Sequence, residues 1–141
     1  MLEIFMRRRS NATLVALAIA AGSVMFSAPS ASAVTYCDSS GYTVTNEPME
    51  RCTKLSNGIL AVKQNSSGLV STEYYKSGGS TITAKLGYSR GGTNHYGSSV
   101  SISSGSTKRQ TWSLSAGSYC TSTIGMLSYS GGTFQTPSSH C

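Results

Sequence analysis

The chain has 141 residues and a formal net charge of +6, and only 11% of its residues are charged. It contains three prolines and 15 glycines and is rich in serine and threonine, a composition that favours extended strands joined by tight turns. Helical bundles and coiled coils are excluded. Tyrosine, valine, isoleucine and leucine recur too regularly, and charge is too sparse, for a disordered chain.

The first 33 residues have the pattern of a secretory signal peptide. Three arginines at 7–9 precede an apolar stretch at 14–21, and Ala-Ser-Ala at 31–33 supplies the small residues of a cleavage site. The apolar stretch is shorter than the roughly 20 residues that a membrane-spanning helix needs. We therefore expect export, cleavage after Ala33, and a single secreted domain at 34–141 that does not span a membrane.

All four cysteines, Cys37, Cys52, Cys120 and Cys141, follow the expected cleavage site. An even number in a short exported chain is typical of a disulfide framework, and four cysteines allow three pairings. We favour Cys37–Cys52 with Cys120–Cys141, because each pair closes a short local loop near one end of the domain. No C-x-x-C spacing favours zinc, so no metal site is expected.

The sequence predicts seven or eight strands. Residues 34–57 are expected to form a cysteine-closed loop with one short strand at 42–45. The nearly continuous apolar run at 58–63 indicates a strand buried on both faces, and 69–76 is its return strand. The remaining strands are expected at 81–88, 99–103, 111–115, 119–129 and 133–135.

Apolar and polar residues alternate most clearly at 81–88. The apolar set that is expected to face the core is Ile82, Ala84, Leu86 and Tyr88. Glycine-containing segments at 90–94 and 104–106 are expected to be turns. Short strands at this spacing predict an all-β fold, either an antiparallel sandwich or a small barrel with two disulfides.

Candidate catalytic residues are few. After residue 33 the only histidines are His95 and His140, and no aspartate or glutamate follows Glu73, so neither a hydrolase triad nor a downstream carboxylate pair is evident. No nucleotide-binding or metalloprotease motif occurs. We expect a protein that is not an enzyme and that has no cofactor.

The segment between Tyr88 and Tyr96 is the best candidate for a recognition surface. Tyrosine, arginine and asparagine in a rigid loop are typical contact residues. We therefore expect a binding site made of Tyr88, Arg90, Asn94, His95 and Tyr96.

Charge is distributed unevenly after residue 73. From there to the end, the basic residues Lys76, Lys85, Arg90, Lys108 and Arg109 have no acidic counterpart. This asymmetry favours attraction to an anionic component of a cell envelope. The alternative is that scattered cations only keep a strand-rich surface soluble.

The central segment resembles the lactococcin-972-type secreted bacteriocins. The resemblance lies in His-Tyr-Gly-Ser-Ser-Val at 95–100, then Arg109, then Ser-Ala-Gly at 115–117. It implies a small secreted β-sandwich that acts on the envelope of competing bacteria.

The cysteine plan resembles that of the tendamistat-type secreted inhibitors of actinobacteria. Cys37 and Cys52 are separated by 15 positions, and a second pair lies near the other end of the chain. The inhibitory Trp-Arg-Tyr of that family is missing between these cysteines. The resemblance implies inhibition of a secreted hydrolase, either an amylase or a protease.

These observations favour a secreted, non-enzymatic binding module used in antagonism between bacteria. It would be a bacteriocin-like protein or a subunit of a secreted toxin complex. The expected partner is another secreted protein or an anionic envelope component, and not a nucleic acid. The alternatives are an inhibitor of a secreted hydrolase and a surface protein of the cell wall or spore.

Overall fold

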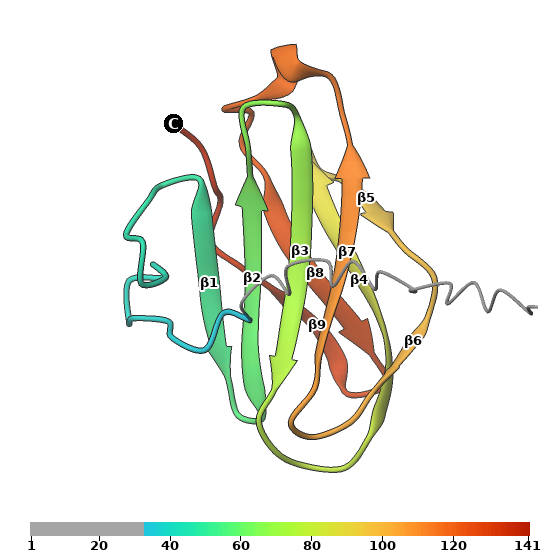
Figure 1. The fold of residues 1–141 in the computed structure, drawn as a ribbon. Helices are drawn as coiled ribbons and strands as arrows, with labels where there is room; N and C mark the ends of the chain where they lie inside the picture. Colours follow the sequence, from blue (N-terminus) through green and yellow to red (C-terminus); the bar gives the residue numbers. More distant parts are fainter. Residues whose placement is uncertain (1–32) are drawn as a thin grey trace, which may run out of the picture. The chain divides into compact units, whose positions relative to one another are not determined.

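The computed structural model describes residues 33–141, so the predicted signal sequence up to residue 32 lies outside the described part. Antiparallel strands dominate these residues, with one 3-10 turn, η1, at Ala116–Ser118 (Figure 1). No helix in this part is long and apolar enough to cross a bilayer. The nine strands are β1 (Glu50–Leu55), β2 (Gly58–Gln64), β3 (Leu69–Lys76), β4 (Ile82–Arg90), β5 (Thr93–Tyr96), β6 (Val100–Ile102), β7 (Thr107–Ser113), β8 (Ile124–Tyr129) and β9 (Gly132–Gln135).

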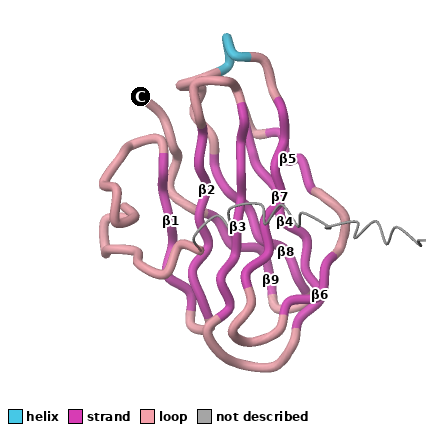
Figure 2. The backbone as a smooth tube through the Cα atoms, in the orientation of Figure 1, coloured by secondary structure: helices cyan, strands magenta, loops and turns pink. Residues whose placement is uncertain are grey.

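The strands form two facing antiparallel sheets. One has the order β1-β2-β3-β7, and the other has the order β5-β4-β8-β9 with β6 also paired to β4. Figure 2 shows the two layers lying one behind the other. The expected all-β antiparallel fold is confirmed, and of the two architectures predicted it is the sandwich, with nine strands rather than seven or eight.

The core lies between the sheets and comes from alternate residues of each strand. Leu60 and Tyr74 of the first sheet meet a group of apolar side chains from the second: Ala84, Leu86, Ile102 and Leu127. A second cluster joins Val62, Val70 and Tyr88, with Trp112 packed against it. The inward face predicted for β4 is confirmed, since Ala84, Leu86 and Tyr88 are buried while Thr83 and Lys85 are exposed.

Strand β2 is buried on both faces, as its apolar run predicts. Leu60 and Val62 face the other sheet. On the outer face, Ile59 and Ala61 pack against the Cys37–Cys52 disulfide and Val34. The segment after residue 33 therefore covers a sheet face that would otherwise expose apolar side chains to water.

The predicted disulfide pairing is confirmed. Cys37 bonds to Cys52, whose Cα atoms lie 5.9 Å apart, and Cys120 bonds to Cys141. Two disulfides in so small a domain indicate folding in an oxidising compartment. The first bridge ties the N-terminal segment to β1, and the second ties the end of the chain to the loop before β8.

The expectation of a strand at 42–45 within a loop is wrong, and β1 was missed. Tyr42 forms only an isolated bridge with Arg51, and the chain turns at 43–46, where Asn46 N–H donates to the Thr43 carbonyl and Asn46 has φ 54°. β1 contains mostly charged and polar residues, so no hydrophobic alternation marks it. Its stability comes from pairing with β2 and from the disulfide at Cys52.

The two disulfides are expected to differ in their resistance to reduction. Cys37 and Cys52 are buried, whereas Cys141 is exposed and Cys120 half-buried. Because exchange requires a thiolate to reach a sulfur atom, mild thiol treatment of the folded protein should open Cys120–Cys141 first. Alkylation and peptide mass spectrometry over a time course would measure the order. If Cys37–Cys52 opened first, or if both disulfides opened at the same rate, burial would not be what protects Cys37–Cys52 from reduction.

Candidate functional site

The candidate site is the hairpin formed by β4 and β5. Gly91 and Gly92 connect the strands with φ values of 55° and 80°, the left-handed pair that a type I′ turn requires. The turn therefore spans only two residues. Thr93 and Asn94, which we expected to belong to the turn, instead begin β5, and all four residues of β5 are exposed.

Strand alternation divides the five predicted residues into two groups. Tyr88 is buried and stacks on His95 with ring centroids 4.7 Å apart. On its other side Tyr88 meets Trp112 of β7 edge-on at 4.9 Å. His95 therefore lies at the rim between the sheets, on a platform of two packed aromatic rings.

Arg90 also points into the sandwich. Its Nε donates to Thr123 Oγ1 at 2.8 Å, and its Nη2 donates to Gln64 Oε1 at 3.0 Å. Burial lowers the pKa of the Arg90 guanidinium from its usual value, while the nearby Tyr88 opposes this effect. Arg90 therefore links the two sheets through β2 and β4 and is not a free surface cation.

Asn94 and Tyr96 lie on the opposite, outer face of the hairpin. Asn94 lines a shallow hollow with Ser89, Ile124 and Gln135. The ring of Tyr96 crosses Gly87, where a Cβ atom would lie 2.6 Å from the ring. The predicted residues thus share one hairpin, but they contribute to two surfaces on its opposite sides.

The backbone of β5 adds a feature that the sequence did not reveal. The N–H of Gly97 donates to the Leu86 carbonyl, and the β4–β5 register makes Tyr88–His95 and Arg90–Thr93 hydrogen-bonded pairs. Alternate residues of an edge strand direct their N–H and C=O groups away from the sheet. In β5 these are Asn94 and Tyr96.

The edge strands β1, β9 and β7 each carry a contact or a charge. The loop at 38–42 lies along β1, where Cys52 N–H donates to the Gly41 carbonyl. At β9, Thr53 Oγ1 donates to the Gln135 carbonyl. β7 carries Lys108 and Arg109, charges that are typical of protected edges. Among the strands at 33–141 that end a sheet order, β5 alone has every residue exposed and none charged.

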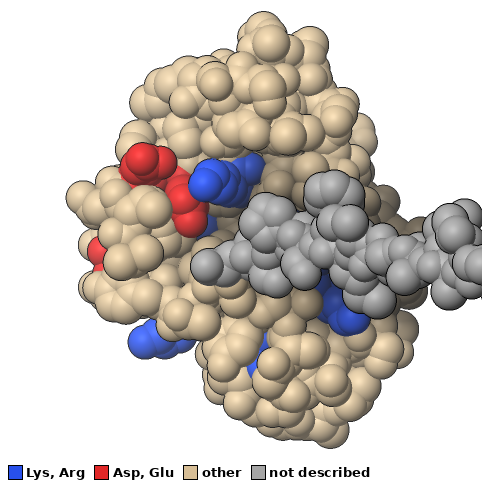
Figure 3. Space-filling view, viewed as in Figure 1, with Lys and Arg blue, Asp and Glu red and all other residues tan. Residues whose placement is uncertain are grey.

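The basic residues of the second half do not form one cationic surface. Lys76 is buried and donates to the Gly78 carbonyl, and Arg109 pairs with the buried carboxylate of Glu73. Lys85 and Lys108 remain exposed. On the face shown in Figure 3, charged side chains are sparse, and basic side chains lie both beside acidic ones and apart from them.

Comparisons with protein-family models, with curated proteins and with solved structures found no match to this chain. Within residues 33–141, no three histidine, cysteine, aspartate or glutamate side chains gather as a metal ion would require. The function is therefore inferred from the hairpin itself.

Replacing Arg90 should test whether its role is structural. Arg90→Ala leaves Gln64 Oε1 without a donor between the sheets and should lower the free energy of unfolding by about 2 kcal/mol. Arg90→Lys should rescue only part of this loss, because an ammonium group does not reproduce the guanidinium fork.

Urea denaturation of residues 34–141 would measure both variants. The matched control is Lys85→Ala on the exposed face of the same strand, which should change stability by less than about 0.5 kcal/mol. Equal stability of Arg90→Ala and the unaltered protein would show that Arg90 does not link the sheets.

Proposed function

We propose that this protein is a secreted binding module that takes up an extended segment of another secreted protein along β5. The observation that carries the proposal is the outward direction of the backbone N–H and C=O groups of Asn94 and Tyr96 on an exposed, uncharged edge. An added strand would satisfy these groups by pairing with them.

The side chains around β5 could supply specificity. In strand addition, main-chain hydrogen bonds provide affinity, and alternate side chains of the added strand enter pockets on the two faces. His95 on its aromatic platform would contact residues on one face. The hollow beside Asn94 would receive residues on the other.

A protein partner is favoured over an anionic envelope polymer. Lys76 and Arg90 are turned inward, and Arg109 is paired with Glu73. Only Lys85 and Lys108 of the five basic residues are then free to attract a polyanion, and exposed charges further apart than a Debye length are screened by salt.

We assign this binding to antagonism between bacteria, as a subunit of a secreted toxin complex or a bacteriocin-like protein. Three features support the assignment: the signal-peptide pattern at 1–33, the disulfide-stapled domain, and the resemblance to lactococcin-972-type bacteriocins at 95–100. That resemblance includes two of the four residues of β5.

Substitution of Asn94 tests the proposal. Asn94→Pro removes an outward N–H but leaves the hydrogen-bonded pairs with β4 in place, as proline at a sheet edge allows. Loss of a main-chain hydrogen bond should weaken partner binding about 10-fold. The matched comparison is Asn94→Thr, which also alters the side chain that lines the hollow but keeps the N–H, so Asn94→Pro should bind more weakly than Asn94→Thr.

Tagged residues 34–141 and both variants would be incubated with culture supernatant of the producing bacterium, and retained proteins quantified by mass spectrometry. The expected partner is retained by the unaltered protein and by Asn94→Thr and is depleted with Asn94→Pro. Equal retention by all three would reject pairing at β5. A retained hydrolase that is slowed by the protein would identify the inhibitor alternative, and failure of the complex to affect any sensitive bacterium would reject the antagonistic role.

A further inference from the structure

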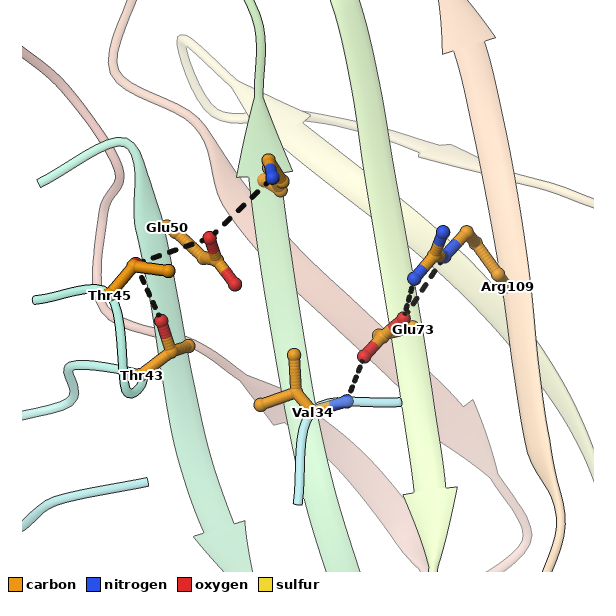
Figure 4. Close-up of polar contacts among 7 residues, drawn as sticks. Val34, Thr43, Thr45, Glu50, Glu73 and Arg109 are labelled. Carbon is orange, nitrogen blue, oxygen red and sulfur yellow. Dashed lines mark hydrogen bonds and ion pairs between the residues drawn. The ribbon is translucent and has the colours of Figure 1, made fainter. Parts of the chain in front are cut away.

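The backbone nitrogen of Val34 lies against a buried carboxylate. Its N–H donates to Glu73 Oε1 at 2.6 Å, although the two residues are 39 positions apart (Figure 4). Glu73 lies on the outer face of β3 and is only 4% exposed. Val34 is the first residue after the expected cleavage site, so this nitrogen is the atom that cleavage would convert into a chain terminus.

The other oxygen of Glu73 is already occupied. Arg109 of the neighbouring strand β7 donates to Oε2 through Nε at 3.0 Å and through Nη2. Figure 4 shows Val34 and Arg109 approaching the carboxylate from different sides. Oε1 is therefore directed at Val34 and not at the arginine.

The position of Val34 is fixed by packing as well as by this contact. Its side chain packs against the cluster formed by Cys37, Cys52, Ile59 and Ala61 on the outer face of the first sheet. The disulfide at Cys37 lies three residues further along the chain. The nitrogen is thus held at the carboxylate by a covalently anchored segment.

We propose that hydrolysis of the Ala33–Val34 peptide bond creates an α-ammonium group that forms an ion pair with Glu73, so that the processed N-terminus becomes a structural part of the domain. In the hydrolysis, water supplies the oxygen that bonds to the Ala33 carbonyl carbon, and the carbon–nitrogen bond to Val34 breaks. The nitrogen gains a proton from water and a second from solvent. A peptidase that accepts small residues at 31 and 33 supplies the activity.

The ammonium group fits this site better than the amide that precedes it. An amide offers one neutral N–H, whereas an ammonium offers three donors and a positive charge, and charge-assisted hydrogen bonds are about twice as strong as neutral ones. The inference is independent of what binds at β5.

The charged groups around Val34 determine how the stability added by the ion pair should depend on pH. Glu73 of β3 and Arg109 of β7 line a small pocket together with Val34. Glu50 of β1 and Lys63 of β2 line the same pocket, and Lys63 Nζ lies 3.8 Å from Glu50 Oε2. Pairing with Glu73 should raise the pKa of the Val34 amine above its usual value of about 8. The added stability is then fully present below about pH 8 and is lost as the pH rises through the raised pKa.

The first test is the N-terminus of the exported protein. Intact-mass and N-terminal peptide analysis of protein from the culture medium should identify Val34 as the first residue. A different first residue would overturn the proposal, because the nitrogen beside Glu73 would then belong to a peptide bond.

The second test compares two forms that differ only at the terminus. One begins at Val34, and the other retains Ala-Ser-Ala at 31–33. Each is also made with Glu73→Gln, and Glu50→Gln serves as a control that alters a neighbouring carboxylate. At pH 6 the form beginning at Val34 should melt about 5 °C higher than the extended form.

This difference should shrink towards pH 10, should survive in Glu50→Gln, and should disappear in Glu73→Gln. An equal difference in Glu73→Gln, or one independent of pH, would overturn the proposal. If Glu73→Gln does not fold, the amine of the protein beginning at Val34 is titrated by NMR, where an unshifted pKa gives the same negative result. Partner capture at β5 is measured separately, so failure here leaves that proposal standing.

Discussion

Strand β2 is buried on both faces, and both the second sheet and the N-terminal segment are needed to bury it. Leu60 and Val62 fill the space between the sheets, and Ile59 and Ala61 require a cover on the outside. The cover is the segment that begins at Val34 and is fixed by the Cys37–Cys52 disulfide. A domain of this size has a small core, so a second apolar layer contributes substantially to its stability.

Buried polar groups between the sheets fix how the β4–β5 hairpin is held. Gln64 Nε2 donates to Ser139 Oγ at 2.7 Å while its Oε1 accepts from Arg90, and Thr72 Oγ1 donates to the Gly87 carbonyl at 2.8 Å. In the described part of the chain every buried side-chain nitrogen and oxygen has a partner. Because the hairpin is anchored in this way, β5 can be presented to a partner with little loss of conformational freedom.

The sequence predicted the elements whose signals are local. The alternation of β4, the apolar run of β2 and the spacing of the cysteines each depend on a few neighbouring residues, and all three were correctly interpreted. β1 escaped detection because most of its residues are charged or polar, so no hydrophobic alternation marks it even though it pairs with its direct neighbour β2.

The five candidate residues were placed in one segment from the sequence, but the face of the hairpin that each occupies was not. Which side His95 or Asn94 occupies depends on the register that Gly91 and Gly92 impose, and four exposed polar residues give no hydrophobic signal for β5. A count of charges could not show that Lys76 is buried or that Arg90 is half-buried and hydrogen-bonded between the sheets. The contact between Val34 and Glu73 joins residues 39 positions apart and follows only from the folded chain.

The functional proposal depends on the pairing of a partner strand with the free edge of β5. Hydrogen exchange of backbone amides, followed by NMR on the free protein and on its complex with the captured partner, tests it most directly. In the free protein, Thr93 and His95 should be protected by β4 while Asn94 and Tyr96 exchange rapidly, and the complex should protect these two amides as well. Protection that arises on another face, with Asn94 and Tyr96 still exchanging rapidly in the complex, would contradict the claim.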